Sequence, residues 1–173
     1  MSSSRSFEIT IISAENLRVN KRPVKKNAFV KIQTDGSNEV KTTRANCEGG
    51  SYPSWNEKVV LDVPLHARFI TLEVNCKATL MGNNSVGIAM IPVSDLVGGY
   101  FPQNQVQFLS YRLWDSKVNR NGVINISVRL KMPEMSSSLL PPQPAINGLP
   151  AQGVLVTGKN SNAVVTGIPV SWF

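Results

Sequence analysis

The residues most able to do chemistry in this chain are the cations between Glu15 and Asp35. This stretch contains six of the chain's 18 Lys and Arg residues and no Asp or Glu. Clustered ammonium and guanidinium groups without neighbouring carboxylates attract polyanions such as anionic lipid surfaces or nucleic acids. The sequence therefore predicts a binding site for a negatively charged partner. The six cations are Arg18, Lys21, Arg22, Lys25, Lys26 and Lys31.

Nucleophilic and metal chemistry have little support in the sequence. His66 is the only histidine, and we expect it at a solvent-exposed turn, where it would not act as a catalytic base. The chain contains no Gly-x-Ser-x-Gly motif, no Walker A sequence and no His/Cys cluster with metal-ligand spacing. Cys47 and Cys76 are too far apart for a CxxC motif and are interpreted as free thiols. The sequence favours a binding module over an enzyme and predicts no cofactor and no metal.

The elements that must position the cations are short strands. Runs of apolar or alternating residues recur along residues 6–130, separated by turn-forming pairs such as Asp35-Gly36 and Asn121-Gly122. One short helical turn is predicted at 93–97. This pattern is typical of an all-β, eight-stranded antiparallel β-sandwich, with most of the cations on a loop between the first two strands. The predicted strands are 6–13, 28–33, 39–44, 55–63, 69–75, 86–91, 106–113 and 122–130.

The composition changes after Pro133. Residues 134–150 contain a run of serines and four prolines, a composition typical of a linker. We therefore expect residues 1–133 to form one domain, and 134–173 to form a linker and an apolar C-terminal tail. The chain has no signal-peptide pattern at its start and no run of about 18 apolar residues. The sequence therefore predicts a cytoplasmic protein.

Four fragments, taken in order, resemble the C2 domain family. They match that family's first strand with its Ala-x-x-Leu, the strand after its first loop, its Pro-x-Trp-Asn-Glu signature and its Gly-centred sixth strand. The resemblance implies a β-sandwich over residues 6–131. Because a further predicted strand, 122–131, closes the domain, it also implies the type II topology, in which the strand that opens a type I domain comes last. The four fragments are 9–17, 27–32, 52–57 and 86–92.

The resemblance also bears on calcium. C2 domains that bind Ca²⁺ use five aspartates on two loops, because a hard cation prefers anionic oxygen ligands. None of the matching positions in this chain is acidic, so we expect no calcium at the usual site. The five degenerate calcium positions are Lys21, Asn27, Cys76, Ala78 and Asn84.

Anionic phospholipid is the ligand that the resemblance implies. Many C2 domains hold phosphoinositide on a basic sheet face, and Lys31, Lys41 and Arg44 match that pattern, whereas Gln33 and Glu39 depart from it. Membrane contact can instead come from the cationic loop between the first two predicted strands, termed here the basic loop. Each Lys or Arg near an anionic leaflet contributes about 1 kcal/mol. A charged loop that only aids solubility is the alternative. The predicted lipid-binding residues are Arg18, Lys21, Arg22, Lys25, Lys26, Lys31, Lys41 and Arg44.

A narrower resemblance, to the plant BON-associated proteins, rests on residues 17–26, 108–113 and 165–170. These are small C2 proteins that partner membrane-bound copines and restrain defence responses and programmed cell death. The resemblance implies a peripheral protein at the plasma membrane that binds anionic phospholipid and a copine-like C2 protein. The tail segment predicted to bind the partner consists of Val165, Thr166, Gly167, Ile168, Pro169 and Val170.

Two other functions remain open at this stage. One is a protein-protein interaction adaptor that does not bind lipid. The other is nucleic-acid binding, which the sequence pI near 9.7 permits. However, single-strand binders interleave cations with aromatic side chains, and duplex binders present a basic recognition helix. The basic loop has no aromatic residue, so the sequence favours lipid over nucleic acid.

Overall fold

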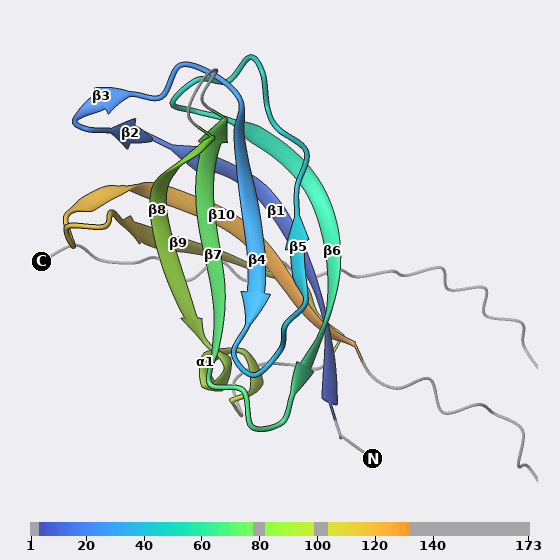
Figure 1. The fold of residues 1–173 in the computed structure, drawn as a ribbon. Helices are drawn as coiled ribbons and strands as arrows, with labels where there is room; N and C mark the ends of the chain where they lie inside the picture. The colour runs from blue at the N-terminus through green and yellow to red at the C-terminus, as the bar shows by residue number, and fades with distance from the viewer. Residues whose placement is uncertain (1–3, 78–81, 99–103, 132–173) are drawn as a thin grey trace, which may run out of the picture. The chain divides into compact units, whose positions relative to one another are not determined.

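Alternation of side chains defines the first strand, β1 (Ser4–Glu15). Phe7, Ile9 and Ile11 are fully buried, while Glu8 and Thr10 between them are only partly covered. This period of two is the pattern of a strand that has one face against a core. The computed structural model describes residues 4–77, 82–98 and 104–131, and Figure 1 shows their arrangement.

Eight strands build the two layers of a sandwich, joined in the order β5-β4-β7-β8-β9-β10-β1-β6. All of their pairings are antiparallel. Between β8 and β9 the pairing consists of Ile88 and Trp114 alone, and there the sheet divides into two four-stranded layers (Figure 1). Besides β1, the strands of the sandwich are β4 (Ala28–Thr34), β5 (Val40–Thr42), β6 (Ser54–Pro64), β7 (Phe69–Lys77), β8 (Asn83–Pro92), β9 (Gln107–Trp114) and β10 (Arg120–Lys131).

The core lies between the layers and is apolar. Leu72 and Ile91 from one layer and Ile124 and Ile126 from the other are fully buried and belong to one hydrophobic cluster. Each such side chain contributes roughly 1.5–3 kcal/mol through removal of its surface from water. The core therefore holds the strands in place, and the loops at their ends are positioned by it.

The predicted sandwich is confirmed, including its permuted topology. The first strand, β1, pairs with the final strand, β10, on one side and with β6, the fourth strand of the sandwich, on the other, as expected of the type II arrangement. Each of the eight predicted strands is present with small differences in length, and α1 (Val93–Val97) is the predicted helical turn. No helix in the described part of the chain is long and apolar enough to cross a membrane.

Two very short strands inside the basic loop were not predicted. They are β2 (Arg18–Val19) and β3 (Arg22–Pro23), which pair as a hairpin. The two residues between them, Asn20 and Lys21, have φ angles of 49° and 66°. Positive φ at both central residues is the geometry of the tight turns that match strand twist. The cations of this loop therefore project from a hairpin.

The predicted linker and tail, 134–173, lie outside the described residues, and so does the predicted partner-binding segment 165–170. The division of the chain at residue 133 therefore stays a prediction.

Candidate functional site

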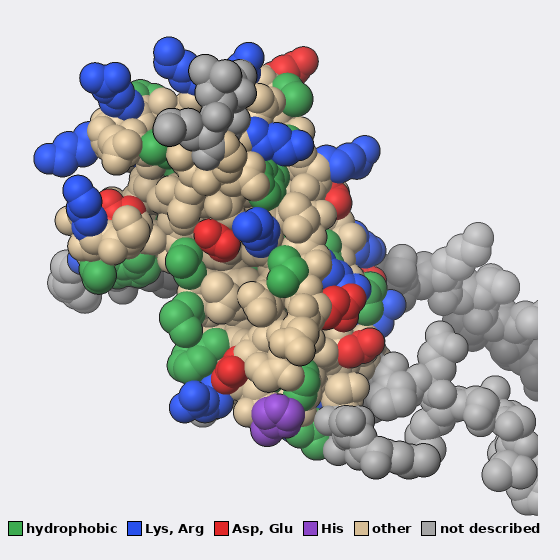
Figure 2. All heavy atoms as spheres, viewed as in Figure 1, with side chains coloured by type: hydrophobic (Ala, Val, Ile, Leu, Met, Phe, Trp, Pro, Cys, Tyr) green, Lys and Arg blue, Asp and Glu red, His purple; other side chains and the backbone are tan. Residues whose placement is uncertain are grey.

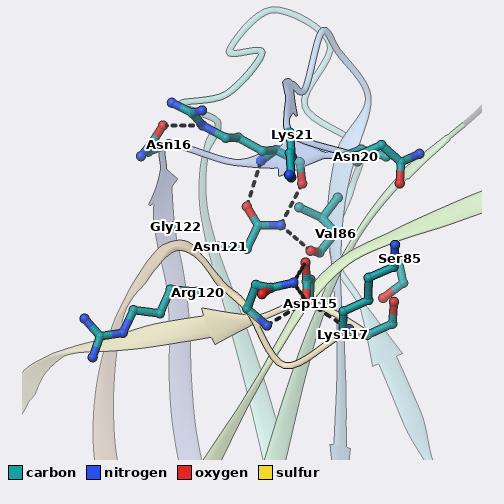
Figure 3. Close-up of a pocket in the computed structure, with 14 residues that line it drawn as sticks. Asn16, Asn20, Lys21, Ser85, Val86, Asp115, Lys117, Arg120, Asn121 and Gly122 are labelled. Atoms are coloured by element: carbon teal, nitrogen blue, oxygen red, sulfur yellow. Dashed lines mark hydrogen bonds between the residues drawn. The ribbon is translucent and has the colours of Figure 1, made fainter.

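The site is built at the end of the sandwich where β1 and β9 finish. Here the basic loop (residues 16–27) and the turn 115–119 both lie beside Asn121, the second residue of β10. Asn121 accepts a hydrogen bond from the backbone N–H of Arg18 at 3.0 Å, and its amide donates to the carbonyls of Arg18 at 2.6 Å and Val86 at 2.5 Å. This amide is buried, so the three bonds join the basic loop to β10 and β8 (Figure 3).

Two buried apolar residues anchor the basic loop to the sandwich. Leu17 is fully buried and Val24 is nearly so. The backbone N–H of Val24 donates to the Leu17 carbonyl at 3.0 Å, and that of Leu17 donates to the Ser51 carbonyl at 3.0 Å. These bonds satisfy backbone groups that would otherwise be buried without a partner. The loop is thus a fixed support for its charged side chains.

Five cations on this support, termed here the loop cations, are all exposed. Within the described residues, the ion pairs involve other Lys and Arg side chains, and no carboxylate lies within 4.0 Å of a loop cation. Figure 2 shows blue Lys and Arg side chains projecting from this end of the molecule. Their charge is therefore available to an external anion. The loop cations are Arg18, Lys21, Arg22, Lys25 and Lys26.

The other three predicted lipid-binding residues, termed here the sheet cations, have a different environment. Each forms an ion pair with a glutamate carboxylate. Because a paired carboxylate offsets the field of its cation, these groups attract an external anion less strongly than unpaired ones do. The pairs are Lys31 with Glu73 at 4.0 Å, Lys41 with Glu39 at 3.2 Å and Arg44 with Glu57 at 3.5 Å.

The sheet cations also do not share one face. Lys41 stands directly opposite Ile32 in the β4–β5 ladder, and Ile32 faces the core. Lys31 stands opposite Glu73 in the β4–β7 ladder, on the other face of the same sheet. Residues opposite one another in an antiparallel pair point to the same side, and neighbours along a strand point to opposite sides. The structure therefore separates Lys31 from Lys41.

Three of the five degenerate calcium positions meet at this end of the sandwich. Cys76 pairs with Ala28 on one side and with Asn84 on the other, and the Asn27 carbonyl accepts a hydrogen bond from the N–H of Lys77 at 3.1 Å. Lys21 stands at the tip of the hairpin, and Ala78 lies outside the described residues.

The side chains at these positions do not fit a calcium ion. Desolvation by burial raises the pKa of the Cys76 thiol, and sulfur is not the oxygen ligand that Ca²⁺ takes. The amides of Asn27 and Asn84 are neutral, and Lys21 brings a positive charge. Across the described residues there is no group of three His, Cys, Asp or Glu side chains that could hold a metal.

Two cations beside the basic loop were not predicted as site residues: Lys117 in the turn 115–119 and Arg120, the first residue of β10. Lys117 and Arg120 line a groove of about 820 Å³ together with Arg18 and Lys21. The sequence predicts a turn at Asn121-Gly122, but these residues lie within β10, directly after the turn 115–119. The sequence contains no signal that places this turn beside the basic loop. Only the pairing of β10 with β1 brings the two segments together.

The predicted position of His66 is confirmed. It lies exposed in the turn between β6 and β7, beside Gly36 and away from the loop cations.

Comparison with known proteins agrees with this geometry. The family model described as the C2 domain matches residues 5–113, more than half of the chain. The chain belongs to the C2 domain family. This C2 domain is also 38% identical over 130 residues to BON1-associated protein 2 of Arabidopsis thaliana. The alignment covers 73% of this chain and 62% of that relative, less than two thirds of its length.

Solved C2 domains have the same fold. A C2 domain of a plant extended synaptotagmin 1 superposes with a TM-score of 0.60 and 15% identity, over 73% of this chain and 94% of that one. A C2 domain-containing protein from a putative elicitor-responsive gene also has a TM-score of 0.60, with 19% identity, over 80% of this chain and 98% of that one. At these identities the likeness concerns the fold alone, and it says nothing of what the loop cations bind.

Proposed function

We propose that this C2 domain is a non-catalytic module that binds anionic phospholipid membranes through its loop cations, without calcium at the usual site. The observation that carries this proposal is the set of five exposed loop cations without a carboxylate partner among the described residues. One of them, Lys21, occupies a position that matches a calcium-binding aspartate. Fixed positive charge supplies here the attraction to an anionic surface that a bound cation supplies elsewhere.

The expected strength is that of reversible, salt-sensitive binding. Each Lys or Arg near an anionic leaflet contributes about 1 kcal/mol, so the loop cations together give roughly 5 kcal/mol before ordering costs. Exposed charges are screened over about 8 Å at physiological ionic strength. Binding should therefore weaken steeply as salt is added. Hydrophobic burial alone would show little such dependence.

The setting that we propose is the cytoplasmic face of the plasma membrane, with a copine-like C2 protein as partner. The support is the 38% identity to a plant protein whose name states its association with BON1. We also propose a negative regulator of plant defence and programmed cell death, on the ground of the resemblance to the plant BON-associated proteins. The tail segment 165–170 is the proposed partner-binding element, and a pull-down with the full chain and with residues 1–131 tests this assignment.

Co-sedimentation with vesicles tests the lipid-binding function. The full chain is mixed with phosphatidylcholine vesicles, with and without phosphatidylserine, in a calcium chelator. We expect sedimentation only with the anionic vesicles, and its loss at high salt. A parallel gel shift uses random oligonucleotides. Binding to the oligonucleotides without binding to anionic vesicles would contradict the proposal, and binding to neither would favour a purely protein-binding adaptor.

A further inference from the structure

The outer edge of β6 has no strand partner among the described residues. β6 is the last strand in the sheet order, and it pairs there with β1 alone. Residues 44–46 cover the start of this edge through hydrogen bonds to Ser54 and Glu57 at 2.8 and 3.0 Å. Beyond Glu57, no described segment forms a backbone hydrogen bond with β6 on this side. The free edge therefore consists of residues 58–63, since Pro64 has no N–H to offer.

Side chains alternate along this free edge. Val59 and Leu61 face the core and are buried, whereas Lys58, Val60 and Asp62 are exposed on the outer face. Val60 keeps 38% of its surface exposed. The outer face of the edge thus carries a cation, an apolar residue and an anion in a row, and the two opposite charges are equally spaced about Val60.

This spacing makes the edge complementary to itself. Two identical strands that pair antiparallel are related by a two-fold axis. When that axis passes beside Val60, Lys58 of each copy stands opposite Asp62 of the other, and opposite charges in such positions stabilise a strand pair. A shift of the pairing by two residues removes both charge pairs, and a shift by one sets core-facing side chains against outer ones. The edge therefore specifies one register.

The charges around Lys58 leave room for another carboxylate. Lys58 lies 3.1 Å from the carboxylate of Glu8, and Lys131 and Arg129 lie 3.8 and 3.9 Å from the same group. Three cations therefore share one carboxylate on the outer face of this layer. Asp62, in contrast, forms no ion pair within the described part of the chain. Pairing of two copies brings the unpaired anion of each to the cation of the other.

We propose that two copies of this chain associate through the free edge of β6, in the antiparallel register centred on Val60. Unpaired backbone groups of a sheet edge are a template for adding a strand. In this register the exposed Val60 side chains also meet on the outer face, and Val59 meets Leu61 on the inner face. The contact covers part of one strand, so the dimer is expected to be weak and dependent on concentration.

The antiparallel pairing fixes where the loop cations of the two copies lie. β6 begins at the end of the sandwich where β1 leads into the basic loop, and it runs away from that end (Figure 1). Because paired β6 strands run in opposite directions, the two sets of loop cations lie at opposite ends of the dimer. Resting on the proposed membrane function, the dimer then binds two anionic surfaces at once and clusters vesicles.

Sedimentation equilibrium of the full chain tests the association. The mass should rise toward twice the 18.9 kDa of one chain as the protein concentration increases. Asp62→Lys replaces both favourable charge pairs by repulsive ones and should raise the dimer dissociation constant roughly 30-fold. The control Asp95→Lys makes the same charge change at an exposed residue outside β6 and should dimerise like the unchanged chain.

A second variant tests the register itself. Lys58→Asp should also weaken self-association, because two anions then face two anions. An equimolar mixture of Asp62→Lys and Lys58→Asp should form a heterodimer, since every pair across the contact again joins opposite charges. Thermal unfolding checks that each variant folds. Asp62→Lys leaves the pair between Lys58 and Glu8 in place, so its result stands even if Lys58→Asp does not fold.

The outcomes separate the contact from the membrane function. A monomer at every concentration overturns the inference, as does a dimer that persists in Asp62→Lys or a mixture of folded variants without a heterodimer. Light scattering with phosphatidylserine vesicles should show clustering by the full chain and by the mixture, and binding without clustering by each variant alone. Dimerisation without vesicle binding supports the contact, and only the membrane function fails. A dimer that binds vesicles but does not cluster them overturns the antiparallel arrangement.

Discussion

The basic loop and the β4–β5 edge both carry cations, but they differ in what surrounds the charge. The loop cations are exposed and have no carboxylate partner among the described residues, whereas each sheet cation is paired with a glutamate. Both sets consist of Lys and Arg residues, so the sequence alone does not distinguish them. The difference shows that capacity to bind an anion depends on unpaired charge, which tertiary structure decides.

The largest expected effect comes from removing the loop charge. The variant Lys21→Gln, Arg22→Gln, Lys25→Gln, Lys26→Gln should weaken binding to phosphatidylserine vesicles by about 4 kcal/mol, two to three orders of magnitude. Co-sedimentation measures this loss. A control with the same change in net charge, Arg5→Gln, Lys58→Gln, Arg68→Gln, Lys131→Gln, should still bind, and thermal unfolding checks both folds. Equal losses in the two variants would show that binding depends on net charge and not on where the cations lie.

The next largest effect is expected on stability, at Gly122, where β10 comes close to the end of β1. Gly122→Ala should lower the free energy of unfolding by about 2–4 kcal/mol, because the added Cβ meets a backbone carbonyl at a positive φ. Gly82→Ala is the matched control, since Gly82 has a φ of +81° but open space around it. It should cost about 1 kcal/mol. Denaturant unfolding compares the two, and similar values would mean that the contact between β1 and β10 is not tight.

The strained turn beside the groove predicts a gain in stability. Val118 is a β-branched residue with a φ of 61°, and its side chain is exposed. Val118→Gly removes this strain and should raise the free energy of unfolding by about 1 kcal/mol. Denaturant unfolding measures the change. An unchanged or lower stability would show that the turn is not strained.

A smaller effect is expected at the sheet cations. Lys31→Gln, Lys41→Gln, Arg44→Gln should weaken binding to phosphatidylserine vesicles by less than about 1 kcal/mol, because the charges it removes are already paired. The measurement is the same co-sedimentation, with the chain's own loop cations intact. A loss as large as that of the loop variant would move the lipid site to the β4–β5 edge.

The smallest expected effect concerns pH. Hydrogen bonds from the backbone N–H and side-chain amide of Asn119 lower the pKa of Asp115. Because the folded pKa is lower than the unfolded one, the stabilisation is present above the unfolded pKa, and it is lost as pH falls through the lowered folded value. The amide resonances of Lys117 and Asn119 should shift together in that acidic range. Titration at the ordinary pKa of 3.8 or above would contradict this.

Much of the fold could be predicted from the sequence, since strand alternation and turn residues are local signals. The hairpin of β2 and β3 could not, because Asn20-Lys21 lacks the glycine that usually marks such a turn. The charge balance also depends on distant residues. Glu57, which pairs with Arg44, comes from β6, and Glu73, which pairs with Lys31, comes from β7. Lys117 and Arg120 reach the groove only through the pairing of the last strand with the first.

Spin labels at the two regions test the central claim most directly. In a background with Cys47→Ser and Cys76→Ser, one label is placed by Asn20→Cys at the hairpin tip and another by Val40→Cys on β5. Phosphatidylserine vesicles are then added in a calcium chelator. The account predicts that the label at position 20 becomes protected from a water-soluble relaxation agent, whereas the label at position 40 stays accessible. Protection at position 40 without protection at position 20 would contradict it.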